Sequence, residues 1–144
     1  MIPLSHFHPL SVHFPIALIT VGFLFDLINL WYKKEPCLSK AAYYLQILGT
    51  LGAVVAWGTG YFIAGTTQME GEALQVKGQH ELFATMSLIA IIVATIARII
   101  LVYLKTDNTL YKYIPFGLSA LSVIFITVTG FLGGRLVIDF MIGI

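Results

Sequence analysis

The sequence predicts an all-α membrane protein whose four transmembrane helices form an up-down bundle. Of its 144 residues, 58% are apolar and 10% are charged, whereas soluble domains carry roughly 25% charged residues. Crossing a bilayer takes about 20 mainly apolar residues in a helix. Four stretches meet that requirement, and they are residues 10–31, 41–66, 80–104 and 114–137. We therefore expect residues 1–144 to form a single transmembrane domain.

The charge balance and the motifs exclude several classes of protein. With 8 basic and 7 acidic residues the net charge is +1, so no strong field exists to attract nucleic acid. The single Cys37 excludes an internal disulfide, and we assign it no chemical role. The sequence shows no nucleophile–base pair, phosphate-binding loop or HExxH zinc motif. We expect an electron-transfer or structural subunit rather than a stand-alone enzyme.

Basic residues near the helix ends predict the orientation in the membrane. Connections 33–40 and 105–112 are short, whereas residues 67–79 form a longer polar loop. Six basic residues fall at the end with the two short connections: Lys33, Lys34, Lys40, Arg98, Lys105 and Lys112. Only Lys77 and Arg135 fall at the other end. Because short cytoplasmic loops carry the excess of lysine and arginine, we expect both termini on the outer side of a bacterial inner membrane.

The first span carries two histidines that lie five residues apart. His8 and His13 differ by about 140° around an ideal helix, so both face one site only if Pro9 or Pro15 distorts the helix. Two small residues, Ala17 and Thr20, follow His13 at helical spacing. We therefore expect the first span to turn His13, Ala17 and Thr20 inward, with a cavity beneath the ring of His13.

The second span carries a stripe of small residues at intervals of four: Gly52, Ala56, Gly60 and Ala64. Such a stripe lets helix backbones approach closely, so we expect it to pack against a neighbouring helix. The more specific alternative is a flat cofactor that lies against the stripe, since a planar ring also needs a side without bulky groups. In the fourth span, Gly130, Gly133 and Gly134 permit the same close contact.

The third span has one face with heptad-like spacing: His80, Ala84, Ser87, Ile91, Ala94 and Arg98. Arg98 follows His80 by 18 residues, and Asp26 follows His8 by the same interval. Because that interval makes about five whole turns, Asp26 and Arg98 are expected at similar depth in two parallel helices. We favour a salt bridge that locks the two helices, since buried charges are normally paired. The alternative is a path for protons or ions.

All four histidines belong to the outer ends of the first and third spans: His6, His8, His13 and His80. In an up-down bundle these two helices lie diagonally across the core. Neighbouring axes about 8–10 Å apart give a diagonal of roughly 11–14 Å, which accommodates two imidazoles with a haem between them. Histidine binds haem iron axially, so we expect haem b with His13 and His80 as ligands and His8 as the alternate. His6 is expected to be an interfacial hydrogen-bonding residue.

Other groups at the same end fit this site. Arg135 and Lys77 are candidates to pair with haem propionates, and the alternative is that they are solvated or contact lipid head groups. Gly60 lies on the flat stripe of the second span. A non-haem metal site formed by His8, His13 and His80 is the alternative, and its ligands suit zinc, copper or iron.

The segment His8-Pro-Leu-Ser-Val-His-Phe-Pro-Ile-Ala-Leu18 resembles the HPxxVHFPIAL signature of a bacterial membrane family, domain of unknown function 2231. The resemblance extends over essentially the whole chain, through His80 and the segment Gly133-Gly-Arg-Leu-Val137. It implies four helices, with an architecture similar to small four-helix b-type cytochromes, and related domains occur fused to c-type cytochrome modules. Where the family often continues with a polar, histidine-containing stretch, this chain has Ile138-Asp-Phe-Met-Ile142.

Together these features predict a membrane electron-transfer subunit that passes electrons between a quinol and an outer-side cytochrome. Glu70, Glu72 and Glu81 in and beside the 67–79 loop are expected to present an acidic rim to a basic partner. Two alternatives stay open. One is a structural or assembly subunit of a larger respiratory complex without its own cofactor, and the other is the non-haem metal site.

Overall fold

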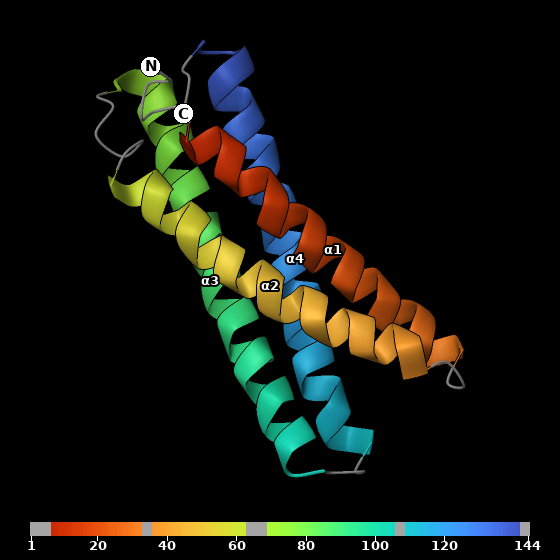
Figure 1. The fold of residues 1–144 in the computed structure, drawn as a ribbon. Coiled ribbons are helices and arrows are strands. Elements are labelled where there is room, and N and C mark those ends of the chain that lie inside the picture. The colour runs from red at the N-terminus through yellow and green to blue at the C-terminus, as the bar shows by residue number, and fades with distance from the viewer. Residues whose placement is uncertain (1–6, 33–35, 63–68, 106–108, 142–144) are drawn as a thin grey trace.

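The computed structural model describes residues 7–32, 36–62, 69–105 and 109–141 (Figure 1). They form four helices, which are α1 (Phe7–Trp31), α2 (Pro36–Phe62), α3 (Gly71–Tyr103) and α4 (Thr109–Ile138). Each contains a window long and apolar enough to cross a membrane, and no strand occurs within these described ranges. The predicted fold class, an all-α bundle of four membrane-spanning helices, is thereby confirmed.

The helix boundaries differ most from the prediction in α3, which begins at Gly71 inside the segment expected to be a loop. That segment is polar, but most of its residues are good helix formers. Ala73 and Val76 are buried, so the first turns of α3 form an amphipathic helix. His80 therefore lies nine residues inside α3, about 13.5 Å along the axis from its first residue. α4 likewise begins at Thr109, before the predicted span.

Three prolines fit their helices without ending them. Pro36 is the first residue of α2, where the missing N–H of proline leaves no helical hydrogen bond unmade. Pro15 and Pro115 lie inside α1 and α4, and both helices continue through them. Because α1 is continuous, His8 and His13 stay on different faces of it.

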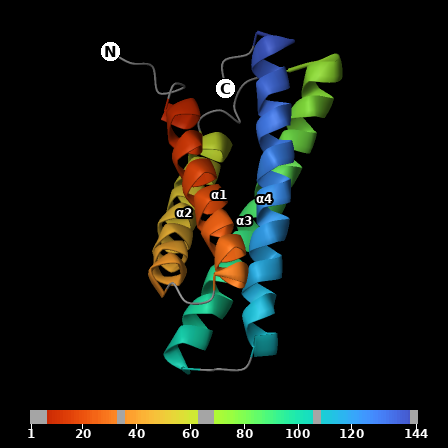
Figure 2. The same ribbon diagram turned by 90° about the vertical axis from the view of Figure 1, so that its right-hand side faces the viewer.

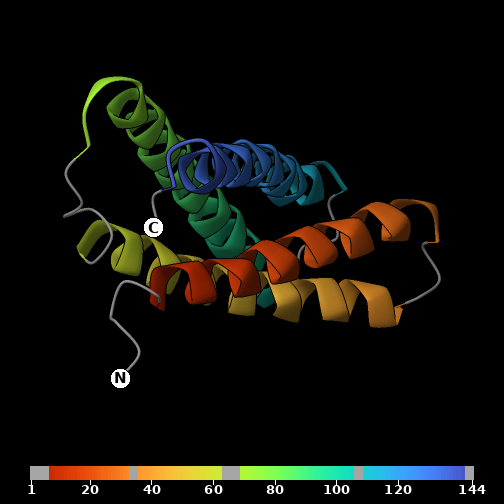
Figure 3. The ribbon, with the colours of Figure 1, turned by 90° about the horizontal axis from the view of Figure 1, so that it is seen from above.

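The helices pair into two hairpins that cross one another. α1 packs along α2 and α3 packs along α4, whereas the hairpins meet through smaller α2–α3 and α1–α4 contacts. Figures 2 and 3 show the hairpins as two layers that cross at an angle instead of running parallel. α1 and α3 lie diagonally across the bundle and run in the same direction, as predicted.

A small apolar core lies where the hairpins cross. Ile19 of α1 and both Ile91 and Ala94 of α3 are almost completely buried, and side chains of α2 and α4 pack around them. A second cluster joins Val76 of α3 to Leu132 of α4. Many other large apolar side chains are exposed on the outside of the bundle, as contact with lipid requires.

The predicted stripe of small residues on α2 faces α1. A Cβ added at Gly52 would lie 3.3 Å from Phe14 Cδ1, and one added at Gly60 would lie 2.8 Å from His8 Cε1. The stripe therefore packs against a neighbouring helix, as the simpler interpretation holds. Its last member, Ala64, lies outside the described residues.

Candidate functional site

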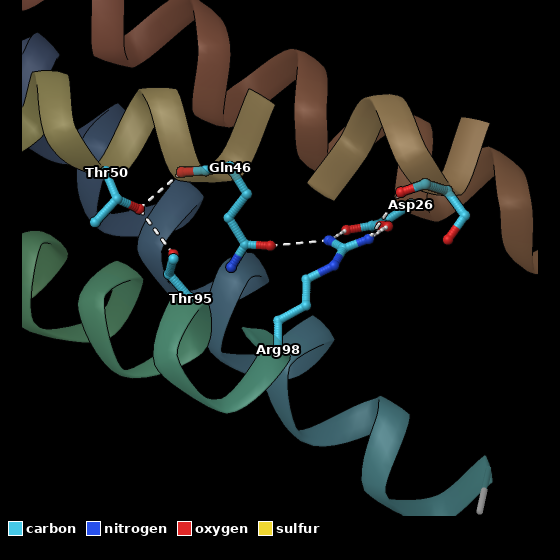
Figure 4. Close-up of polar contacts among 6 residues, drawn as sticks. Asp26, Gln46, Thr50, Thr95 and Arg98 are labelled. Atoms are coloured by element: carbon cyan, nitrogen blue, oxygen red, sulfur yellow. Dashed lines mark hydrogen bonds and ion pairs between the residues drawn. The ribbon is translucent and has the colours of Figure 1, made fainter. Parts of the chain in front are cut away.

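The two ends of the bundle carry different polar clusters. We call the end with Asp26 and Arg98 the ion-pair end, and the end with His8 and His80 the histidine end. Arg98 Nη2 of α3 donates to Asp26 Oδ1 of α1 at 2.7 Å, and Arg98 Nη1 donates to Asp26 Oδ2 (Figure 4). Each of the two side chains is 15% exposed. The predicted salt bridge between α1 and α3 is confirmed.

Arg98 has further partners that the sequence did not indicate. Its Nη1 also donates to Gln46 Oε1 at 2.8 Å, and its Nη2 donates to the Ser39 carbonyl at 3.3 Å. Thr50 Oγ1 donates to the Gln46 carbonyl at 2.8 Å and lies 2.8 Å from Thr95 Oγ1 (Figure 4). A guanidinium bonded to carboxylate, amide and carbonyl oxygens has little bonding capacity left for a ligand. The cluster therefore ties α1, α2 and α3 together.

His8 is anchored between α1 and α2. It is buried, and its Nδ1 lies 3.1 Å from Thr59 Oγ1. The Thr59 hydroxyl donates to the Ala56 carbonyl at 2.9 Å, so the hydroxyl oxygen accepts from His8 Nδ1–H, and Nε2 keeps its lone pair. The ring rests on Gly60, where even a Cβ would come within 2.8 Å of it. The predicted site residue Gly60 thus serves the site by making room for an imidazole.

His80 is anchored in the same way between α3 and α4. Its Nδ1 donates to the Thr129 carbonyl at 2.9 Å, because a carbonyl oxygen can only accept. In the neutral ring Nε2 then carries the lone pair. The ring rests on Gly133, where an added Cβ would lie 3.2 Å from His80 Cε1. Each hairpin therefore contributes one imidazole that is held through Nδ1.

An internal repeat relates these two anchors. The two histidines are 72 residues apart, and so are the members of the ion pair, Asp26 and Arg98. The glycines beneath the rings, Gly60 and Gly133, are 73 residues apart. Positions of α1 thus correspond to positions of α3, and positions of α2 to positions of α4. Each hairpin contributes one histidine and one glycine to the site, while the group that anchors the ring is a threonine hydroxyl in one hairpin and a backbone carbonyl in the other.

The surroundings of His8 favour its neutral form. His8 lies before Ser11, where the apolar window of α1 begins. Burial lowers the pKa of His8 below its ordinary value of 6.5, and the neighbouring charge of His80 lowers it further. Neutral imidazole is the form of histidine that binds metals. At neutral pH His8 therefore needs to lose no proton to act as a ligand.

Two cavities adjoin the histidine pair. The larger has a volume of about 430 Å³ and is lined by residues from all four helices, a size within the roughly 300–1,000 Å³ of ligand pockets. The smaller has a volume of about 190 Å³ and is lined chiefly by α2 and α3. Four residues line both cavities: His8, Trp57, His80 and Ala84. The two imidazoles therefore lie where the two spaces meet.

The structure turns His13 away from the inward face of α1. His13 and Ala17 are exposed, although His13 contributes to the lining of the larger cavity. The inward face predicted through His13, Ala17 and Thr20 is therefore wrong. Because α1 is continuous, the face that holds Asp26 also holds the residue 18 positions earlier. That face consists of residues at heptad-like spacing: His8, Pro15, Ile19, Gly22 and Asp26.

The two predicted cationic anchors lie in different surroundings. Arg135 Nη2 contacts Glu72 Oε1 at 3.0 Å and Arg135 Nε contacts Asp139 Oδ2 at 2.9 Å, and Arg135 lines neither cavity. Lys77 lines the smaller cavity. His6 lies outside the described residues.

The geometry also bears on the kind of metal site. Within the described ranges, no three histidine, cysteine, aspartate or glutamate side chains come together as a metal ion would need. The alternative of a non-haem metal site formed by His8, His13 and His80 stays a prediction. Two imidazoles suffice for haem, because the porphyrin supplies the remaining ligands of the iron.

Sequence reasoning missed the groups that hold the rings. Thr59 and the Thr129 carbonyl anchor the two Nδ1 atoms, and Gly133 supports the second ring. The 72-residue spacing was the available signal for the histidine pair, since it relates His8 to His80, but it maps Gly60 onto Leu132 and does not predict Gly133. No sequence pattern indicated the Thr129 carbonyl as an anchor, because every residue carries a backbone carbonyl.

Comparison with known proteins identifies the family to which the chain belongs. No curated protein and no solved structure matches the chain. A family model described as a predicted membrane protein, DUF2231, matches residues 4–144. This match covers nearly the whole chain and agrees with the resemblance at the HPxxVHFPIAL segment. The chain therefore belongs to the DUF2231 family of predicted membrane proteins.

Proposed function

We propose that the protein is a membrane electron-transfer subunit that binds one b-type haem between His8 and His80. The observation that carries the proposal is the pair of imidazoles, one from each hairpin, held through Nδ1 and adjoining the same two cavities. Histidines that ligate metals almost always donate their other ring N–H to a protein group. Nε2 of each ring would then be the atom that holds the iron.

The lining of the larger cavity fits a flat, apolar macrocycle. It includes small residues from three helices, Ala53, Ala84 and Gly130 among them, and the two ligand histidines. When bound, a b-type haem supplies one-electron redox chemistry. The chain contributes two ligands held in a fixed orientation and an apolar lining that excludes water. His8 replaces His13 as the first-helix ligand because His8 lies on the inward face of α1.

A membrane quinol is the electron donor that the surroundings favour. Trp57 and Tyr61 stack with ring centroids 5.3 Å apart, and both line the smaller cavity beside the histidines. Both side chains are exposed on the bundle surface, where a planar quinol head group approaches from lipid. Oxidation of one quinol releases two electrons and two protons, so two one-electron transfers complete each oxidation.

The proposed acceptor is a c-type cytochrome or another respiratory subunit on the outer side of a bacterial inner membrane. Glu70 at the histidine end is exposed. Glu72 and Glu81 already pair with basic side chains of the same end, so the acidic rim is weaker than the sequence suggests. We therefore expect electron transfer to a basic cytochrome to slow only moderately as salt is added.

An absorption spectrum with three histidine variants tests the proposal. Protein purified after haem-supplemented expression is expected to show an intense Soret band and sharp bands on reduction. His8→Ala and His80→Ala are each expected to abolish the low-spin spectrum, because each removes an axial ligand. His13→Ala is the matched control on the same helix and is expected to keep the spectrum.

Two results would change the proposal. Loss of haem in His13→Ala together with retention in His8→Ala would show that His13 is the ligand of α1. A colourless wild-type protein would reject haem binding altogether. Metal analysis of that colourless sample then separates a transition-metal site from a structural subunit without a cofactor.

A further inference from the structure

The two cavities beside the histidine pair lie between different pairs of helices. The larger, of about 430 Å³, is lined chiefly by α1 and α4, and the smaller, of about 190 Å³, is lined chiefly by α2 and α3. Under the internal repeat, α1 corresponds to α3 and α4 to α2, so the two cavities lie between corresponding pairs of helices. Their different volumes therefore reflect the side chains that stand at corresponding positions.

The side chain that makes the difference is Trp57. The glycines beneath the two rings set an interval of 73 residues between α2 and α4, and at this interval Trp57 corresponds to Gly130. Tyr61 corresponds to Gly134. Trp57 lines both cavities, whereas Gly130 lines only the larger, and a Cβ added at Gly130 meets nothing within 4 Å. An indole therefore fills space beside one cavity that stays open in the other.

The indole of Trp57 is held in place from two directions. Its Nε1 donates to Thr85 Oγ1 at 3.0 Å, and the Thr85 hydroxyl donates to the Glu81 carbonyl at 2.8 Å. The indole also stacks on Tyr61, with 5.3 Å between the ring centroids and 9° between the ring planes. A hydrogen bond to α3 and a stacking contact on α2 thus fix the ring between the two helices that line the smaller cavity.

The larger cavity opens toward lipid. Three residues of its lining, Ile16 of α1 together with Gly130 and Val137 of α4, are exposed on the bundle. All three lie within the stretches of their helices that are long and apolar enough to cross a membrane. Exposed positions within such a stretch face acyl chains. The larger cavity is therefore reachable by an apolar ligand dissolved in the bilayer.

We propose that Trp57 determines which side of the histidine pair the haem macrocycle occupies. Its indole closes the smaller cavity to the macrocycle, and the open larger cavity admits the macrocycle from lipid between α1 and α4. The smaller cavity then stays available for the planar head group of a quinol. This inference rests on the proposed function and adds the side of entry and the residue that sets it.

Two introduced cysteines report which cavity is filled. Ile16→Cys changes a residue that lines only the larger cavity, and Glu81→Cys changes one that lines only the smaller. Each is made with Cys37→Ser, and the purified full-length apoprotein in detergent is labelled with a membrane-permeant maleimide with and without ferric protoporphyrin IX. At a free haem concentration about ten times Kd, we expect labelling of Ile16→Cys to slow about tenfold. Labelling of Glu81→Cys is expected to stay unchanged.

Exchanging the two corresponding positions tests the role of Trp57 itself. Gly130→Trp adds an indole to the larger cavity and is expected to weaken haem binding about tenfold, the effect of overfilling a packed site. Gly117→Trp is the matched control on α4, because Gly117 lines neither cavity and an added Cβ meets nothing within 4 Å. Gly130→Trp combined with Trp57→Gly is expected to restore binding and to move the protection from Ile16→Cys to Glu81→Cys.

Several results would overturn the inference. Equal protection of both cysteines, or protection of Glu81→Cys alone, would show that the macrocycle does not prefer the larger cavity. Wild-type affinity in Gly130→Trp, or no recovery in the folded double variant, would remove the role of Trp57. If Gly130→Trp does not fold, Trp57→Gly alone decides, because both cysteines are then expected to be protected. A wild-type protein that binds no haem would reject the proposed function itself, whereas haem bound without a preferred side would leave that function standing.

Discussion

The ion-pair end and the histidine end use corresponding positions of the two hairpins for different purposes. At the ion-pair end, Asp26 and Arg98 contact each other directly, and Gln46 adds a further hydrogen bond. At the histidine end, His8 and His80 are each fastened to their own hairpin, and cavities adjoin both rings. At the ion-pair end the two side chains therefore satisfy each other by direct contact. Separate anchorage leaves one nitrogen of each ring for a ligand at the histidine end.

An apolar layer separates the two ends. Ile19 and Ile91 are related by the same 72-residue interval, and each lies seven residues before the ion-pair member of its own helix. Both are almost completely buried where the hairpins cross. Buried hydroxyl groups lie one helical turn to either side of Ile91 on α3: Ser87 Oγ lies 3.1 Å from Ser122 Oγ, and Thr95 Oγ1 lies 2.8 Å from Thr50 Oγ1. The structural role of the ion pair is supported by the direct contact of Asp26 with Arg98, and the path for protons stays a hypothesis.

Breaking the ion pair is expected to lower the free energy of unfolding more than crowding the histidines does. Asp26→Ala leaves the Arg98 guanidinium largely buried without its carboxylate, and we expect the free energy of unfolding to fall by about 3–5 kcal/mol. Unfolding by denaturant in detergent measures this loss. The double variant Asp26→Ala with Arg98→Ala is expected to recover much of it, because neither charge is then left alone. Losses that simply add would show that the two residues are not coupled.

Crowding the histidine anchors has the next largest effect. Gly60→Ala places a Cβ 2.8 Å from His8 Cε1, so we expect a loss of about 1–3 kcal/mol and a displaced ring. Gly133→Ala, with a contact of 3.2 Å, is expected to cost less. Stability and the haem spectrum are the measurements. Gly58→Ala and Gly117→Ala are matched controls on the same helices, since an added Cβ meets nothing within 4 Å and neither residue lines a cavity. Equal damage in the controls would contradict the role of the rings.

Labelling of Cys37 is expected to leave the free energy of unfolding unchanged. It tests which end of the bundle faces the cytoplasm. Cys37 is exposed near the start of α2, at the ion-pair end. If that end faces the cytoplasm, as its basic residues predict, Cys37 reacts in intact cells with a permeant thiol reagent and resists an impermeant one. The control Glu70→Cys, made with Cys37→Ser, is expected to react with both. The reverse pattern would place the histidine end inside.

The sequence by itself determined the four spans, the pairing of Asp26 with Arg98 and the inward face of α3. These features depend on the composition and spacing of residues within one helix. Hydrophobic length predicts a membrane span, and an interval of about five helical turns keeps two residues on one face. The same interval pointed to His8 as the partner of His80, whereas the small residues below His13 pointed to a cavity beneath its ring; His13 does line the larger cavity, but Ala17 and Thr20 do not.

Only the tertiary structure decided which histidine of α1 faces inward, which groups hold the rings and where Lys77 and Arg135 lie relative to the cavities. The rotation of a helix about its axis depends on what its neighbours present, and here Gly60 and Gly133 open a place for each ring. The Thr129 carbonyl becomes an anchor only because α4 lies beside α3. Such contacts join residues about 50 positions apart, and the local pattern of a single helix cannot specify them because it does not fix how two helices pack.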